Sequence, residues 1–121
     1  MRFLLIALGG GAGSLLRYLA GTAIMVRYGR TFPLGTMVIN VTGSFLIGLL
    51  MTLFTQRLQQ ENLRLLLVVG FLGGYTTFSS FEWETYSLIR QGGFWLGLIN
   101  VAGSVLFGYL AVYLGALLAR R

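Results

Sequence analysis

The fold is decided by the stretch Gly70-Phe71-Leu72-Gly73-Gly74-Tyr75-Thr76-Thr77-Phe78-Ser79-Ser80-Phe81, which lies in the middle of a long apolar segment. After the glycine pair, four hydroxyl side chains fall within five positions. Glycine costs a helix interior about 1 kcal/mol relative to alanine, so we expect the helix to unwind at the glycine pair. Irregular backbone at membrane depth is tolerated only inside protein or beside a cavity. Freed carbonyl groups there can hold a cation, and freed N–H groups can face an anion.

The composition around this stretch is typical of a membrane protein. The chain has 121 residues, of which 56% are hydrophobic and 10% charged, whereas about a quarter of an ordinary soluble domain is charged. Every basic residue is Arg, every acidic residue is Glu, and His and Cys are absent. Most metal sites and most nucleophile–base pairs are therefore excluded, and we do not expect an enzyme. The arginines are spread singly, so the net charge of +6 does not predict a nucleic-acid surface.

Four apolar stretches follow one another along the chain, at about 3–26, 34–55, 63–89 and 94–119. Each is close to the ~20 residues that a helix needs to cross a bilayer, and spanning segments of this kind must satisfy their backbone internally. The first stretch does not read as a signal peptide, because it has no clear cleavage site and three similar stretches follow it. The sequence predicts one all-α domain over 1–121, with four transmembrane helices and a break in the third.

The arginines flanking these stretches set the expected orientation in the membrane. Five fall on the side that holds both termini and three on the other side, which is a weak bias under the positive-inside rule. A chain charged so evenly can insert both ways, and this permits an antiparallel homodimer. The first group is Arg2, Arg57, Arg64, Arg120 and Arg121, and the second is Arg27, Arg30 and Arg90.

A short internal repeat occurs in the second and fourth stretches. Residues 40–48 and 100–108 share the pattern N-V-x-G-S-x-L-x-G, with six of nine positions identical. Small residues at such spacings usually let membrane helices approach closely, and we favour that role for the glycines. An amide inside a span needs a partner or a watery path, so Asn40 is balanced between helix–helix contact and function. Asn100 is nearer the start of its span, and the membrane interface explains it more simply.

Other candidates have two interpretations each. From spacing alone, Phe78 and Phe81 are ordinary packing residues, but the positive edges of their rings can also face a small anion. Arg17 lies inside the first stretch, where it can extend to the interface or give an anion path a positive entrance. Glu82 and Glu84 lie near the end of a span, where they can pair with an arginine such as Arg17 or Arg90.

Three motifs follow one another along the chain: Gly9-Gly10-Gly11-Ala12-Gly13 with Arg17-Tyr18, the segment Phe32-Pro33-Leu34-Gly35-Thr36-Met37-Val38-Ile39-Asn40, and Gly73-Gly74-Tyr75-Thr76-Thr77-Phe78-Ser79-Ser80-Phe81. In order and at the expected spacings, they resemble those of the CrcB/Fluc family of small fluoride channels. The resemblance covers essentially the whole chain. Its departures are small: Ser80 replaces a common Thr, and Tyr75 replaces a usual aliphatic residue.

The resemblance implies a function and an assembly. It implies an antiparallel, dual-topology homodimer in the bacterial inner membrane, with two pores through which fluoride leaves the cytoplasm passively and fluoride toxicity is relieved. It further implies a structural sodium ion on the twofold axis, held by the backbone carbonyls of Gly73 and Thr76. The residues that it assigns to the fluoride path are Asn40, Phe78, Phe81, Thr77, Ser104 and Arg17.

Two other classes of membrane protein remain as alternatives. A small dual-topology multidrug exporter has the same number of spans, but it needs a membrane-embedded carboxylate in its substrate path. Glu82 and Glu84 are the only candidates for that role, and the other three stretches contain no acid. A non-transporting assembly subunit is the second alternative, and Gly-Gly followed by Thr-Thr argues against it because packing alone does not require a broken span.

Overall fold

The computed structural model describes residues 1–121, and all of its regular elements are helices. Four segments are long and apolar enough to cross a membrane: Arg2–Tyr28, Leu34–Gln56, Glu61–Arg90 and Phe94–Ala119. The first, second and fourth are the single helices α1 (Arg2–Tyr28), α2 (Leu34–Gln56) and α6 (Phe94–Ala119). The predicted all-α, four-span fold is confirmed, and the span ends differ from the expected ones by at most two residues.

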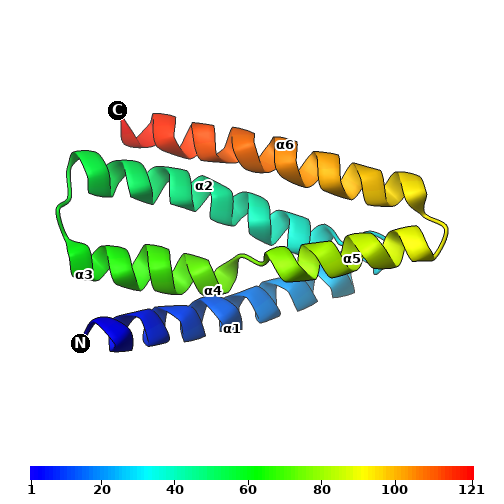
Figure 1. Ribbon diagram of the computed structural model, residues 1–121, viewed down its shortest axis with the longest axis horizontal. Helices are drawn as coiled ribbons and strands as arrows, with labels where there is room; N and C mark the ends of the chain where they lie inside the picture. The colour runs from blue at the N-terminus through cyan, green and yellow to red at the C-terminus, as the bar shows by residue number, and fades with distance from the viewer.

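The third span is composite. It begins with α3 (Glu61–Arg64), continues as the π-helical segment η1 (Leu65–Leu72) and the short α4 (Gly73–Tyr75), and resumes as α5 (Phe78–Arg90). Successive spans run in opposite directions, so both termini lie at the same end of the molecule (Figure 1).

The break between α4 and α5 lies at Thr76 and Thr77, three residues later than the glycine pair at which it was predicted. Both threonines are extended, with φ/ψ of −82°/155° and −148°/119°, whereas Gly73 and Gly74 stay helical. The expectation that the glycine pair itself unwinds is therefore wrong. Gly74 instead allows close packing, because a Cβ there would overlap the carbonyl oxygen of Gly10 on α1.

Glycines bring α1 against the first half of the third span. A Cβ on Gly9 would overlap the Leu66 carbonyl oxygen, and one on Gly13 would overlap that of Phe71. In these contacts the glycines of α1 let two membrane helices approach closely, which is the usual role of small residues in spanning helices.

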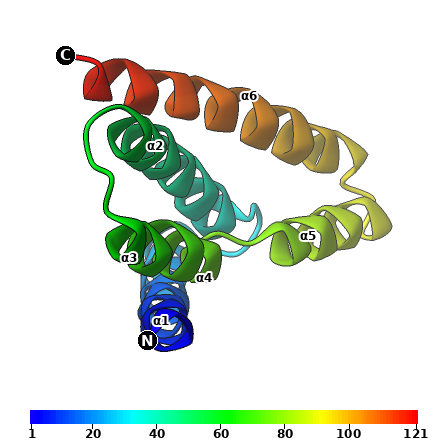
Figure 2. The same cartoon turned by 60° about the vertical axis from the view of Figure 1, so that its left-hand side comes forward.

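The two halves of the third span have different neighbours. Before the break, η1 and α4 pack on α1, and after it, α5 packs on α6. Figure 2 shows the chain leaving α4 beside α1 and crossing to α5 beneath α6. α2 packs most extensively on α6 and also contacts α1 and the third span. The break thus lies where the chain changes partners.

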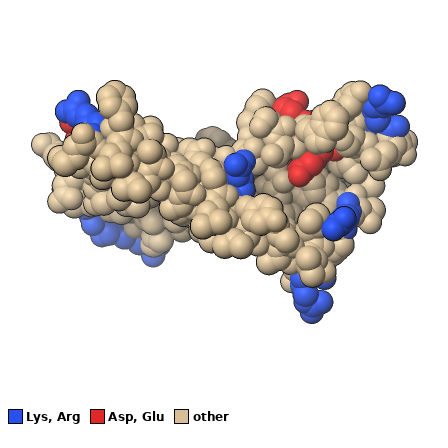
Figure 3. Space-filling model, turned by 90° about the horizontal axis from the view of Figure 1, so that it is seen from below, with Lys and Arg blue, Asp and Glu red and all other residues tan.

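The surface of a single chain is mostly apolar. Only 16 of the 121 residues are buried, and many large hydrophobic side chains are exposed. On the face shown in Figure 3, most charged side chains lie toward the two ends and a broad uncharged surface separates them. This distribution is the one expected of a protein whose middle lies in lipid.

Candidate functional site

A groove of about 420 Å³ lies beside the break, between α2, the third span and α6. It brings together residues that are up to 65 positions apart in the sequence, from Asn40 to Val105. Seven of the eight predicted site residues line it: Asn40, Gly73, Thr76, Thr77, Phe78, Phe81 and Ser104.

Asn40, which lies on α2, binds the backbone at the break. Its Nδ2 donates a hydrogen bond to the Thr77 carbonyl oxygen at 3.0 Å, and the Thr77 N–H donates to its Oδ1 at 2.9 Å. These bonds replace helical bonds that the break removes, which matters because lipid offers no substitute. Since Nδ2 carries two hydrogens, the second remains available to a ligand in the groove. Asn40 therefore makes the contact between helices that the sequence allowed, and its functional role in the groove stays a prediction.

Thr77 starts the second half-helix. Its Oγ1 accepts a hydrogen bond from the Ser80 N–H at 3.3 Å, as an N-cap residue does. The first N–H groups of a helix have no partner within the helix, and they form the positive end of its dipole. Because Thr77 and Phe78 both line the groove, this positive end of α5 borders it.

Ser104 adds an unpartnered hydroxyl from α6. Its Oγ atom is buried and has no hydrogen-bond partner in the protein. A buried polar atom without a partner is costly, so a ligand that accepts a hydrogen bond from Ser104 would remove that cost.

The two phenylalanines lie at different depths. Phe81 is 8% exposed, whereas Phe78 is 73% exposed. Their ring centroids are 5.8 Å apart, with the rings tilted by 44°. Phe81 thus forms part of the wall of the groove, and Phe78 forms part of its open rim.

The break also frees carbonyl oxygens. The Thr77 N–H bonds to Asn40, so Gly73 loses the donor that a continuous helix would give its carbonyl. No hydrogen bond reaches the Thr76 carbonyl either. A Cβ on Gly73 would meet nothing within 4 Å, so this residue faces open space. Neutral carbonyl oxygens suit a hard cation such as sodium both at the end of a half-helix, as at Gly73, and in unwound backbone, as at Thr76.

Arg17 is not part of the groove. It lies half-buried on α1, and α1 contributes no residue to the groove lining. The structure therefore separates Arg17 from the other predicted site residues. Its helix, α1, packs on the first half of the third span and does not border the groove.

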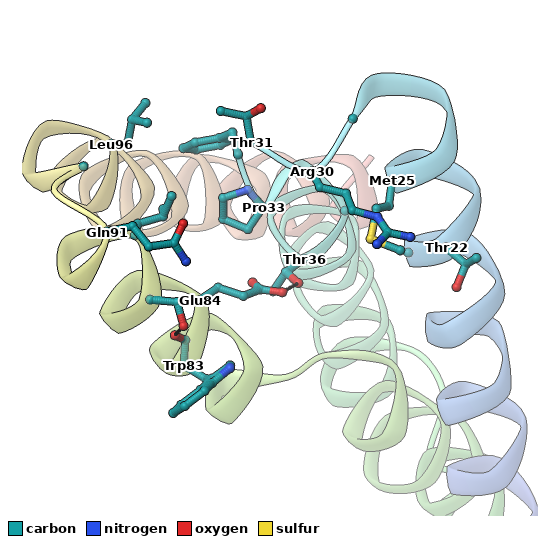
Figure 4. Close-up of a pocket in the computed structure, with 17 residues that line it drawn as sticks. Thr22, Met25, Arg30, Thr31, Pro33, Thr36, Trp83, Glu84, Gln91 and Leu96 are labelled. Carbon is teal, nitrogen blue, oxygen red and sulfur yellow. Dashed lines mark hydrogen bonds between the residues drawn. The ribbon is translucent and has the colours of Figure 1, made fainter.

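A second cavity, of about 880 Å³, lies at the end of the molecule opposite the termini (Figure 4). There the Thr36 hydroxyl donates to Glu84 Oε1 at 2.7 Å, while Glu84 Oε2 is buried without a partner. The expected pairing of Glu82 or Glu84 with Arg17 or Arg90 is wrong. The only ion pair in the chain joins Arg2 and Glu61 at 3.3 Å, and both side chains are largely exposed.

Sequence reasoning missed this Thr36–Glu84 contact. A usable signal was the helical spacing of Phe81, Glu84 and Leu88, which places Glu84 on the inward side of α5. Sequence reasoning also missed the contact of Asn100, which is 1% exposed and whose Nδ2 donates to Thr85 Oγ1 at 2.9 Å. Asn100 thus joins α5 to α6 inside the protein, and its depth near the membrane interface stays a prediction.

The fold and the groove define a class of protein: a small four-span integral membrane protein with a polar groove beside an interrupted helix, a combination used for ion binding in membrane transport. The chain belongs to the CrcB family, since the family model described as CrcB-like protein, Camphor Resistance (CrcB), matches residues 4–116.

Three relatives illustrate how far this similarity extends. A protein of Solibacter usitatus is 70% identical over the full length of both chains. One of Magnetococcus marinus is 46% identical over 99% of this chain and 98% of its own. One of a Hydrogenobaculum species is 46% identical over 98% of this chain and 97% of its own. Each of the three is named fluoride-specific ion channel FluC.

Proposed function

We propose that this chain forms a fluoride-selective channel through which fluoride leaves the cytoplasm passively, which relieves fluoride toxicity. The observation that carries the proposal is the groove, where Asn40, Thr77 and Ser104 converge beside two phenylalanines. Full-length relatives named as fluoride-specific channels support the choice of ion. No carboxylate lines the groove, so proton-coupled export of a cation finds no carrier group there.

The difficulty for such a channel is dehydration. Moving a carboxylate-sized ion into a medium of low dielectric costs on the order of 20 kcal/mol, and a smaller anion costs more. The groove offers donors that together replace part of the lost water: the second N–H of Asn40, the hydroxyl of Ser104 and the positive end of α5. The ring edges of Phe78 and Phe81 add a weaker attraction.

The pore is completed by a second, antiparallel copy in this proposal. Phe78 is exposed on the rim of the groove and Gly73 faces open space, so a single chain leaves one side uncovered. Arginines at both ends of the spans allow either orientation. A homodimer of this kind has two grooves and therefore two pores, and the expected location is the bacterial inner membrane.

The freed carbonyl oxygens of Gly73 and Thr76 are of the ligand type that a structural sodium ion requires. Two oxygens from one chain would be too few to enclose a cation, and the same two residues of the second copy would complete the site. When bound, the ion supplies positive charge that offsets the repulsion between converging carbonyl dipoles. In this chain, the role of the break is to hold those oxygens in place.

The proposal is tested by fluoride release from liposomes, followed with a fluoride electrode. We expect rapid release of fluoride and no release of chloride, and we expect Phe81→Ile and Asn40→Ala to slow the release at least tenfold. Phe3→Ile and Asn62→Ala are matched controls, since Phe3 is 88% exposed and neither residue lines the groove. Size-exclusion chromatography confirms that each variant is folded. Vesicles that hold fluoride as tightly as empty ones would overturn the proposal.

A further inference from the structure

The backbone break is anchored to α2 on both sides, and only one of the two anchors belongs to the groove. After the break, Asn40 binds the Thr77 peptide. Before the break, the Tyr75 hydroxyl lies 2.9 Å from Thr42 Oγ1. Tyr75 does not line the groove and neither does Thr42, so this second anchor has no place in the fluoride path proposed above.

The direction of the second hydrogen bond follows from proton counting. Thr42 Oγ1 also lies 2.8 Å from the Val38 carbonyl oxygen and 3.0 Å from that of Ile39. A threonine hydroxyl has one hydrogen, and it is used on these carbonyls of its own helix. The Tyr75 hydroxyl must therefore be the donor and Thr42 the acceptor, which leaves every hydrogen of the pair bonded.

The Tyr75 side chain is also well fixed. It is 8% exposed, and its ring stacks on Phe71 with centroids 5.8 Å apart and planes 9° from parallel. Gly43 permits the approach of α2 at this level, because a Cβ there would overlap Thr76 Cγ2 and touch Tyr75. The ring, the hydroxyl and the glycine together fix the last helical residue before the break.

We propose that the Thr42–Tyr75 hydrogen bond positions the carbonyl oxygens of Gly73 and Thr76 and so sets the sodium affinity of the chain. Both carbonyls are within two residues of Tyr75, and Thr76 is enclosed between the two anchors. Without the phenol donor, the backbone before the break is held on α2 by packing alone. This inference rests on the sodium site of the proposed function, and Tyr75 and Thr42 act as positioning residues rather than ligands.

The test measures the sodium dependence of the homodimer. Purified protein is exchanged into a large organic cation and titrated with sodium chloride, and the dimer fraction is followed by size-exclusion chromatography. We expect Tyr75→Phe, which keeps the ring, to raise the half-saturating sodium concentration about fivefold, which corresponds to about 1 kcal/mol. Thr42→Val should give a similar shift, Thr42→Ser should behave like the wild type, and the double variant should be no worse than either single change.

The control is Tyr86→Phe, which removes an exposed tyrosine hydroxyl that bonds Arg90 on α5 and should leave the sodium curve unchanged. A contact that only stabilises the fold would lower dimer stability equally at all sodium concentrations, whereas a positioning contact loses its effect at saturating sodium. An unshifted curve for Tyr75→Phe, additive effects in the double variant, or a wild type insensitive to sodium would overturn the inference. Fluoride release from vesicles is measured separately, because it tests the channel proposal alone. Release of fluoride together with an unshifted sodium curve would overturn this inference and leave the channel proposal standing.

Discussion

At the scale of single residues, Ser104 is the most informative member of the groove. Its buried hydroxyl has no partner in the protein, so removing it leaves no broken hydrogen bond behind. Ser104→Ala should therefore keep or raise the thermal stability while slowing fluoride release about tenfold or more, since a hydrogen bond to a charged group is worth roughly 1.5–3 kcal/mol. Ser87→Ala, which removes a hydroxyl bonded to the Trp83 carbonyl outside the groove, should not affect release. Normal release by Ser104→Ala would remove this residue from the path.

Sequence reasoning at this scale relied on residue types that are unusual in lipid. Asn40 stands out as an amide inside a span, and the structure places it in the groove. Arg17 is also an unusual residue for a span, but it lies outside the groove. Its position depends on which span packs on α1, and the sequence does not specify that packing. Contacts such as Thr36–Glu84 and Thr42–Tyr75 join residues 48 and 33 positions apart, and no periodicity in the sequence specifies such a pairing.

At the scale of helices, α1 offers a matched pair of glycines for testing the packing. A Cβ on Gly13 would overlap the Phe71 carbonyl oxygen, while a Cβ on Gly11 would meet nothing within 4 Å. Gly13→Ala should destabilise the protein by about 1–3 kcal/mol through overpacking. Gly11→Ala should be neutral or stabilising by up to about 1 kcal/mol, because alanine is the better helix former. Unfolding in detergent measures both, and equal effects would contradict the packing described for α1.

The elements themselves were largely predictable because their signal is local. Apolar runs end near arginines, and this fixed the four spans to within a few residues. The position of the break was not predicted correctly, because glycine in a membrane helix either loosens the backbone or admits a neighbour. Gly74 serves the second purpose, and that choice depends on α1, which lies about 60 residues earlier in the chain. The hydroxyls of Thr76 and Thr77 were the better guide to the unwound residues.

At the scale of the whole molecule, the balance of arginines at the two ends governs orientation. A reporter fused to the C-terminus should be found on both sides of the membrane. Replacing Arg27 and Arg30 with Gln leaves five arginines at the terminal end against one at the other, so a single orientation should dominate and fluoride resistance should fall. The matched change Arg57→Gln with Arg120→Gln removes two charges from the opposite end. A wild-type protein with one orientation only would contradict the antiparallel assembly.

The change of partners along the third span has a mechanical consequence. Bilayers differ in thickness, and spanning helices adjust to them by tilting. A tilt of α6 acts on both α5 and α2, since both pack on α6. Because α2 is hydrogen-bonded to the third span on both sides of the break, we expect a change in bilayer thickness to reach the carbonyl oxygens at the break through α2.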